Sequence, residues 1–138
     1  ELDERVSNAI FMAGIQDLKD KKIGEMSKGQ RQRVGIASLL VDESDLIILD
    51  EPFSGLDPLG IRDLKQLILK LRDSGKTIFL NSHILSEVES LCDHYAIINN
   101  GELIQQGEMS NVLSQGTLEE YFYQTLSVRD SSLGSANE

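Results

Sequence analysis

The sequence contains little of what stabilises small secreted proteins or anchors a chain in a membrane. It has a single cysteine, Cys92, which excludes an internal disulfide and a zinc site built from several cysteines. A reducing cytosol is therefore the simplest setting, and we interpret Cys92 as a small buried apolar residue. No apolar run approaches the roughly 20 residues that span a bilayer. We therefore expect neither a signal peptide nor direct membrane insertion.

Positive charge is also scarce. The chain has 13 Lys and Arg residues against 23 Asp and Glu residues, which gives a formal net charge of −10. A protein that binds the nucleic-acid backbone needs a basic face, so this balance argues against nucleic acid as a partner. With 40% apolar residues among 138, the chain can build the core of one domain of ordinary size. It begins with Glu1 inside an expected helix, and we expect it to be a piece of a longer chain.

Apolar residues recur at helical spacing in some segments and form short continuous runs in others. Helical spacing predicts helices, and continuous aliphatic runs predict strands that are covered on both faces, as in a parallel sheet. Asn100-Gly101 predicts a type I′ hairpin. The predicted elements are helix 2–13, loop 16–25, helix 27–41, strand 46–49, helix 58–74, strand 77–80, helix 84–92, strand 95–98, antiparallel strand 103–105 and a helix from Ser110 onward. Alternating strands and helices are typical of an α/β sheet.

Two acidic residues follow the first predicted strand directly. Asp50 and Glu51 would lie at the C-terminal edge of a parallel sheet, where open α/β folds bind their ligands. One carboxylate can hold a hydrated magnesium ion, and the other can orient and deprotonate a water molecule. Taken alone, the pair has an ordinary structural explanation too, because many strands end in an acidic residue where a turn follows.

Two further polar groups lie at the ends of predicted elements. Ser27, Gly29 and Gln30 begin a helix, where free N–H groups and the helix dipole favour a phosphate, although Ser27 and Gln30 also form an ordinary capping box. His83 follows the strand 77–80 and could contact a phosphate, although a loop histidine commonly makes only a local hydrogen bond. We assign no role to the second histidine, His94.

The order and spacing of these groups resemble those of the ATPase domains of ABC transporters. Met26-Ser-Lys-Gly-Gln-Arg-Gln-Arg resembles the family's signature loop, and Leu46-Ile-Ile-Leu-Asp-Glu51 resembles its Walker B strand with the catalytic glutamate. Ser54-Gly-Leu-Asp57 resembles the D-loop, and His83 falls where the switch histidine belongs. The resemblance runs from Leu2 to about Gly107. Residues 81–89 and 100–107 look most like ATPases that are paired with ABC-2-type export permeases.

The signature loop departs from the family's commonest form at two positions. Lys28 stands where that form has glycine, and Met26 stands where it has leucine. Methionine for leucine is nearly isosteric. A lysine beside a phosphate site is compatible with anion binding, so neither change argues against the resemblance.

The resemblance implies a role for each matching residue. In the family, two ATPase domains sandwich two ATP molecules, so Ser27, Gly29 and Gln30 would face the γ-phosphate or ribose of ATP held by the partner subunit. Asp57 would cross the dimer interface. Asp50 would hold Mg²⁺ through water, while Glu51 would be the general base and His83 would contact the γ-phosphate. Such positioning and charge neutralisation is what phosphoryl transfer requires.

The resemblance also implies a partial fold. We expect the α/β fold of a P-loop NTPase, a mostly parallel sheet flanked by helices, with the Walker A strand missing. No segment reads Gly-x-x-x-x-Gly-Lys-Ser/Thr. In the family that strand lies between the strand leading to His83 and the strand at 95–98, so we expect a gap there with unpaired backbone groups. The expected parts are a signature subdomain (1–42), the ATPase core (43–108), a helical extension (109–126) and a disordered tail (127–138).

The sequence thus predicts part of an ATP-hydrolysing subunit that powers an ABC transporter, with export favoured over import. The resemblance implies ATP and Mg²⁺ as cofactors, a second ATPase subunit, in the simplest case a homodimer, and membrane permease subunits. It also implies a location on the inner face of the cell membrane, bound through the permease. The isolated fragment is expected to be inactive. The alternatives are a non-catalytic piece that dimerises or completes a partner's sheet, and an ABC-type ATPase outside transport.

Overall fold

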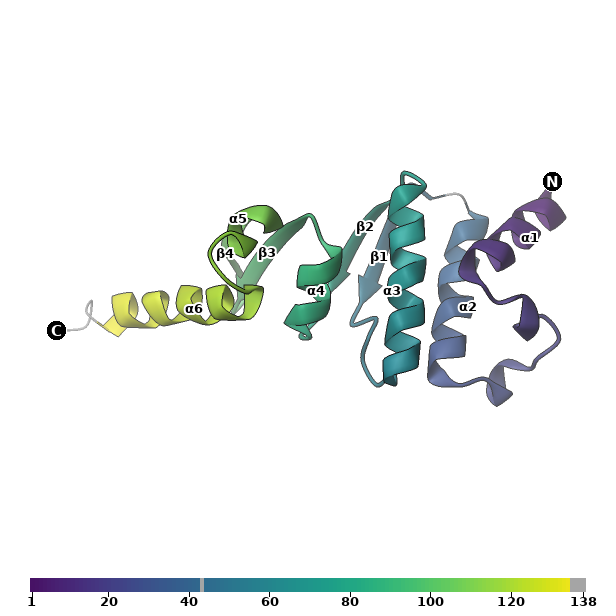
Figure 1. Ribbon diagram of the computed structural model, residues 1–138, viewed down its shortest axis with the longest axis horizontal. Coiled ribbons are helices and arrows are strands. Elements are labelled where there is room, and N and C mark those ends of the chain that lie inside the picture. Colours follow the sequence, from purple (N-terminus) through teal and green to yellow (C-terminus); the bar gives the residue numbers. More distant parts are fainter. Residues whose placement is uncertain (43, 135–138) are drawn as a thin grey trace. The chain divides into compact units, whose positions relative to one another are not determined.

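The computed structural model describes residues 1–42 and 44–134, with side chains described up to residue 127. The chain divides into two compact units between His83 and Ile84 (Figure 1). This division does not coincide with the boundaries expected from the sequence after residues 42 and 108. None of the described helices is long and apolar enough to cross a membrane.

The first unit begins with two helices that pack on each other. Helix α1 (Leu2–Ala13) ends at Gly14, whose φ of 62° is the left-handed conformation that glycine adopts readily. Two short 3₁₀ helices, η1 (Gln16–Leu18) and η2 (Ile23–Glu25), occupy the predicted loop and lead to α2 (Lys28–Val41). The buried apolar side chains of this region are those of Ala9, Ala13, Ile15, Leu18, Met26, Ile36 and Ala37.

The sheet of the first unit consists of two parallel strands. β1 (Leu46–Asp50) pairs with β2 (Thr77–Asn81) in a register that runs from Leu46 opposite Thr77 to Asp50 opposite Asn81. The intervening helix α3 (Pro58–Asp73) packs against β2 and α2. It buries Leu64, Leu67, Ile68 and Leu71.

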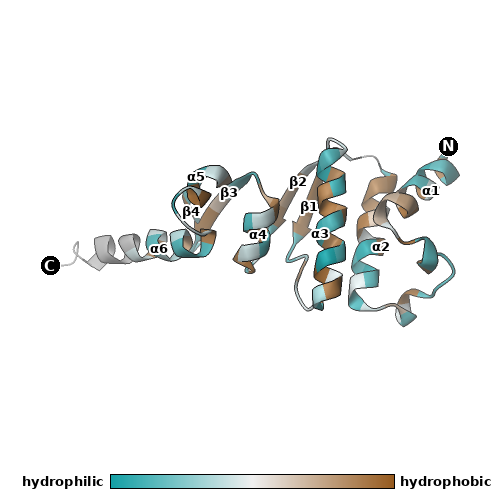
Figure 2. Cartoon of the chain, viewed as in Figure 1, coloured by the Kyte–Doolittle hydropathy of each residue, from teal (hydrophilic) through white to brown (hydrophobic). Residues whose placement is uncertain are grey.

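One prediction about this sheet is wrong in the described chain. The continuous aliphatic run of β1 predicted a strand covered on both faces, but burial alternates along it. Ile47 and Leu49 are buried, whereas Ile48 and, on β2, Phe79 remain 65% and 59% exposed. Successive side chains of a strand point to opposite faces, and this chain covers only one of them. Figure 2 colours most of both strands as hydrophobic, and the exposed Leu46, Ile48 and Phe79 make the open face apolar.

The second unit contains an antiparallel hairpin surrounded by helices. Its elements are α4 (Leu85–Leu91), β3 (His94–Asn99), β4 (Glu102–Glu108), α5 (Met109–Leu113) and α6 (Leu118–Gly134). Asn100 and Gly101 both have positive φ, 49° and 78°, as the predicted type I′ turn requires. β4 is longer than predicted because its pairing with β3 continues past a register shift after Ile97.

A small apolar core holds the second unit together. Met109, Val112 and Leu118 are buried, and Cys92 and Tyr121 pack against them. Burial, with a smaller effect from Asp93, raises the pKa of the Cys92 thiol. Cys92 packs against this core as predicted, but it is only half-buried and not fully buried.

The C-terminal end differs from the expected disordered tail. The backbone continues as α6 to Gly134, and only residues 135–138 of the predicted tail lie outside the described part. A capping box starts this helix: the Thr117 hydroxyl accepts from the Glu120 N–H, and the Glu120 carboxylate accepts from the Thr117 N–H. The serine-rich composition favoured a prediction of disorder. Once the capping box has started the helix, however, residues of moderate helix propensity can extend it, because extending a helix is easier than nucleating one.

The fold class is α/β, as predicted. The described strands form two separate two-stranded sheets, β1 with β2 and β3 with β4. No described backbone pairing joins β2 to β3, which are the strands between which the family's Walker A strand was expected.

Candidate functional site

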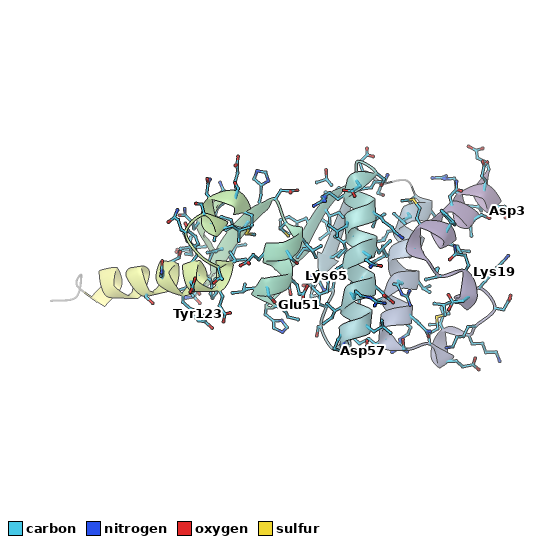
Figure 3. All side chains as sticks on the ribbon, viewed as in Figure 1. Asp3, Lys19, Glu51, Asp57, Lys65 and Tyr123 are labelled. Carbon is cyan, nitrogen blue, oxygen red and sulfur yellow. The ribbon has the colours of Figure 1, made fainter. Side chains whose placement is uncertain are left out.

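Glu51 and His83 meet at the C-terminal edge of the parallel sheet. The register places Asp50 opposite Asn81, so the residues that follow the two strands leave the sheet side by side. Nδ1 of His83 lies 2.8 Å from Oε2 of Glu51, and because a carboxylate only accepts, the ring N–H must donate. Both side chains are open to solvent, with His83 71% and Glu51 37% exposed. Figure 3 shows Glu51 at this edge.

The backbone at Glu51 is turned and firmly held. Its φ of 46° lies in the left-handed region, which is uncommon for a residue with a side chain. Asn81 stabilises this turn, because the Glu51 N–H points to both the Asn81 side-chain oxygen, at 2.9 Å, and its backbone oxygen, at 3.1 Å. The next two residues, Pro52 and Phe53, are among the most deeply buried in the described chain. The backbone of Glu51 is thus held between the end of β1 and the two buried residues that follow it.

Asn81 was missed by the sequence analysis. The available signal was an amide residue at the end of a strand, next to a predicted functional histidine. Its importance depends on the register with β1, which the sequence alone does not give.

Asp50 lies on the other side of its strand from the buried Leu49. It borders a shallow hollow of about 340 Å³ together with Gln32, Ile48 and Pro52. Within residues 1–42 and 44–134 no cluster of three or more His, Cys, Asp or Glu side chains could hold a metal ion. A single carboxylate nevertheless fits Mg²⁺, which keeps several water ligands and is commonly completed by substrate phosphates.

The start of α2 is a complete capping box. The Ser27 hydroxyl oxygen accepts from the Gln30 N–H at 3.2 Å, and the Gln30 side-chain oxygen accepts from the Ser27 N–H at 3.0 Å. Lys21 donates to the same oxygen of Gln30 at 3.1 Å. The N–H groups of Lys28 and Gly29, in the first turn, have no intrahelical acceptor. Together with the Ser27 hydroxyl hydrogen, they form a set of donors that suits an anion.

The same helix end lies against the loop that follows Glu51. A side chain at Gly29 would be in ordinary contact with Leu56 and Gly60, at 3.7 and 3.8 Å. Asp57 begins α3, since its carboxylate accepts from the Gly60 N–H at 2.8 Å. Figure 3 shows Asp57 at this end of α3. One carboxylate oxygen of Asp57 is therefore used within its own chain.

The predicted site residues fall into two groups in the first unit. Glu51 and His83 are in contact, and Ser27 and Gln30 are in contact. Among the described residues no hydrogen bond or ion pair links one group to the other. Asp50 and Asp57 lie before and after Glu51 and contact neither His83 nor Gln30 through such bonds.

Comparison with known proteins gives one consistent family. The sequence profile of the ABC transporter family matches residues 1–54. An uncharacterised ABC transporter ATP-binding protein of Nostoc sp. is 47% identical over 117 residues, which are 83% of this chain and 35% of that protein. The bacitracin transport ATP-binding protein BcrA of Bacillus licheniformis is 43% identical, over 73% of this chain and 33% of its own length. The chain thus spans about a third of the length of these curated relatives.

A solved structure agrees with the sequence comparison. CbiO1 of Clostridium perfringens, described as part of the ABC transporter complex cbiONQ, superposes with a TM-score of 0.75 and is 33% identical. The superposition covers 97% of this chain and 52% of that one.

Proposed function

Because the chain belongs to the ABC transporter ATP-binding family, we propose that it supplies the signature and catalytic parts of an ATP-hydrolysing subunit that powers a transporter. The observation that carries this proposal is the 2.8 Å contact between Glu51 and His83 at the edge of a parallel sheet. It joins a carboxylate that can accept a proton from water to a ring that can reach a phosphate.

Each catalytic residue has a stated role in this proposal. Glu51 is the general base for the attacking water, and its turned backbone keeps the carboxylate at the sheet edge. With Nδ1–H directed at Glu51, the neutral His83 ring presents Nε2 as an acceptor, and the protonated ring presents Nε2–H as a donor to the γ-phosphate. Asp50 holds Mg²⁺ through water, as its single exposed carboxylate allows.

The donors at the start of α2 bind ATP held by a second copy of the subunit. Ser27 keeps a hydroxyl hydrogen to donate, because its oxygen only accepts in the capping box. Gly29 leaves the helix end open to a phosphate, and Gln30 has amide donors. Asp57 reaches the second subunit with the carboxylate oxygen that does not cap α3.

The proposed partners are a second ATPase subunit and a membrane permease on the inner face of the cell membrane. Two observations favour an exporter. Residues 81–89 and 100–107 resemble ATPases paired with ABC-2-type export permeases. Two similar proteins are named for transport of bacitracin, and we infer that export of such a compound is the direction. Direct contact with nucleic acid is not part of the proposal, given the net charge of −10.

The test is Glu51→Gln in the full-length protein. Without a general base, hydrolysis should fall by at least about 100-fold, whereas ATP-dependent dimers should persist because the amide keeps the shape of the site. ATP turnover and sedimentation velocity measure the two outcomes. The matched control is Glu119→Gln, an exposed residue on α6, which should hydrolyse ATP like the wild type. Turnover at the wild-type rate in Glu51→Gln would refute the assignment.

The exposed apolar face of β1 and β2 favours a second candidate function. As a separate polypeptide, these 138 residues would be a non-catalytic piece whose open sheet face is covered by another chain. The reading frame upstream of Glu1 separates the candidates: a Walker A segment in the same polypeptide supports the ATPase, and a start codon at this point supports the separate piece.

A further inference from the structure

Lys21 and the backbone of Ser27 both donate to the side chain of Gln30. The Gln30 amide oxygen receives two hydrogen bonds, one from the Lys21 ammonium at 3.1 Å and one from the Ser27 N–H at 3.0 Å. An ammonium and a backbone N–H are both donors without acceptor capacity, so the atom between them must be the amide oxygen. The amide nitrogen therefore points the other way with two N–H donors. No described residue accepts a hydrogen bond from it.

We propose that Lys21 is a positioning residue for nucleotide binding, acting through Gln30. This inference rests on the proposed function, in which Gln30 contacts ATP held by the partner subunit. A flip of the amide would exchange its oxygen and nitrogen. Without Lys21, only the hydrogen bond from the Ser27 N–H would oppose this flip, and Lys21 adds a second hydrogen bond. A flip would turn the amide oxygen toward the anionic nucleotide. Lys21 lies nine residues before Gln30 and outside the signature loop. It reaches Gln30 because the chain between η1 and η2 passes close to the start of α2.

The charge of Lys21 makes the arrangement suitable for a nucleotide. A charged donor makes a stronger hydrogen bond than a neutral one and polarises the amide, which makes its outward N–H groups better donors. Because the contact is exposed to solvent, its loss should weaken nucleotide-dependent association by roughly three- to tenfold rather than abolish it.

The experiment uses the full-length protein carrying Glu51→Gln, in which ATP-bound dimers accumulate. Lys21→Met should raise the ATP concentration for half-maximal dimerisation by roughly three- to tenfold. Lys21→Arg, which keeps a charged donor, should restore it to within about twofold. The matched control is Lys22→Met. It removes the same charge from the neighbouring residue, whose side chain is also exposed. It should behave like the parent protein.

Two variants of Gln30 separate positioning from simple structural support. Gln30→Glu keeps an oxygen for Lys21 and Ser27 but replaces the outward N–H donors with a second oxygen, so dimerisation should fail although the protein folds. In a Gln30→Met background, Lys21→Met should have no further effect, because the two residues act through one contact.

The outcomes distinguish this inference from the proposed function. Equal behaviour of Lys21→Met and Lys22→Met, or a full further loss in the Gln30→Met background, would overturn the positioning role. Absence of ATP hydrolysis in the wild type and of ATP-dependent dimers in the Glu51→Gln parent would instead overturn the proposed function. If Lys21→Met does not fold, Lys21→Gln retains a neutral donor and allows the same comparison with Lys22→Gln.

Discussion

Gly55, in the loop between β1 and α3, occupies a position where no side chain fits without adjustment. Its φ is 66°, and a methyl group there would lie 2.6 Å from the Lys28 ammonium and 3.6 Å from two carbons of the Lys28 side chain. Gly55→Ala should therefore cost about 1–2 kcal/mol of unfolding free energy through backbone strain alone. It should also displace Lys28 from this loop. Chemical denaturation of the full-length protein measures the first effect, and ATP turnover measures the consequence of the second.

Gly35→Ala is the matched control for that substitution. Gly35 lies inside α2, and a methyl group there would meet nothing within 4 Å. Alanine is favoured over glycine in a helix, so this variant should be more stable by about 0.5–1 kcal/mol. A Gly55→Ala protein that is as stable as Gly35→Ala would contradict the assignment of strain to the Gly55 loop.

The contacts of individual residues could be predicted where both partners lie close together in the sequence. Ser27 and Gln30 are three residues apart, and Asp57 precedes Pro58, so both helix starts could be recognised directly. Asn81 and Lys21 could not, because each contacts a residue that only the fold brings near. The left-handed backbone of Glu51 has no sequence signal of its own.

Whole elements were predictable because each is specified by nearby residues. Helix α2 and the hairpin turn at Asn100 start and end as their caps and turn residues require. The errors concern what an element packs against. The continuous hydrophobicity of β1 predicted burial on both faces, but in the described residues only the face with Ile47 and Leu49 is covered.

The start of α6 provides a prediction at the scale of one element. Thr117→Ala removes the hydroxyl that accepts from the Glu120 N–H, and such caps contribute about 1 kcal/mol. Amide protons in the first turn of α6 should therefore exchange about fivefold faster with solvent, whereas those of α3, capped by Asp57, should be unchanged. Hydrogen exchange followed by mass spectrometry measures both. Equal exchange in the two proteins would show that packing of Leu118, not the cap, holds this turn.

The same cap should depend on pH in a defined direction. The backbone N–H of Thr117 and, less strongly, its hydroxyl lower the pKa of Glu120 from its ordinary value of 4.5. A group whose pKa is lower in the folded state stabilises that state above the unfolded value and loses this contribution as the pH falls through the folded value. Protection of the first turn of α6 should consequently decrease only below about pH 4.5, and Glu120→Ala should remove that dependence.

At the scale of the whole molecule, the described chain leaves one face of its parallel sheet uncovered. It spans about a third of its curated relatives, and the open face of its parallel sheet exposes large apolar side chains on both strands, including Leu46, Ile48 and Phe79. Proteins rarely leave such faces in water without a partner. The contact between Glu51 and His83 and the capping box of Ser27 and Gln30 both lie within the first unit, and each is formed by residues of that unit.

The polypeptide of residues 1–138 alone should consequently show no measurable affinity for ATP at micromolar nucleotide. The phosphate donors proposed for it are those at the start of α2 and the His83 ring. No segment of the sequence has the Gly-x-x-x-x-Gly-Lys-Ser/Thr pattern whose backbone and lysine enclose the β- and γ-phosphates. In the proposed function the α2 donors complete a site on another subunit and do not form one alone. Titration calorimetry tests this, with the full-length Glu51→Gln protein as the binding control. Tight binding by the short polypeptide would mean that another of its loops encloses the phosphates. The signature residues would then bind a nucleotide held by the same chain and not one held by the partner subunit.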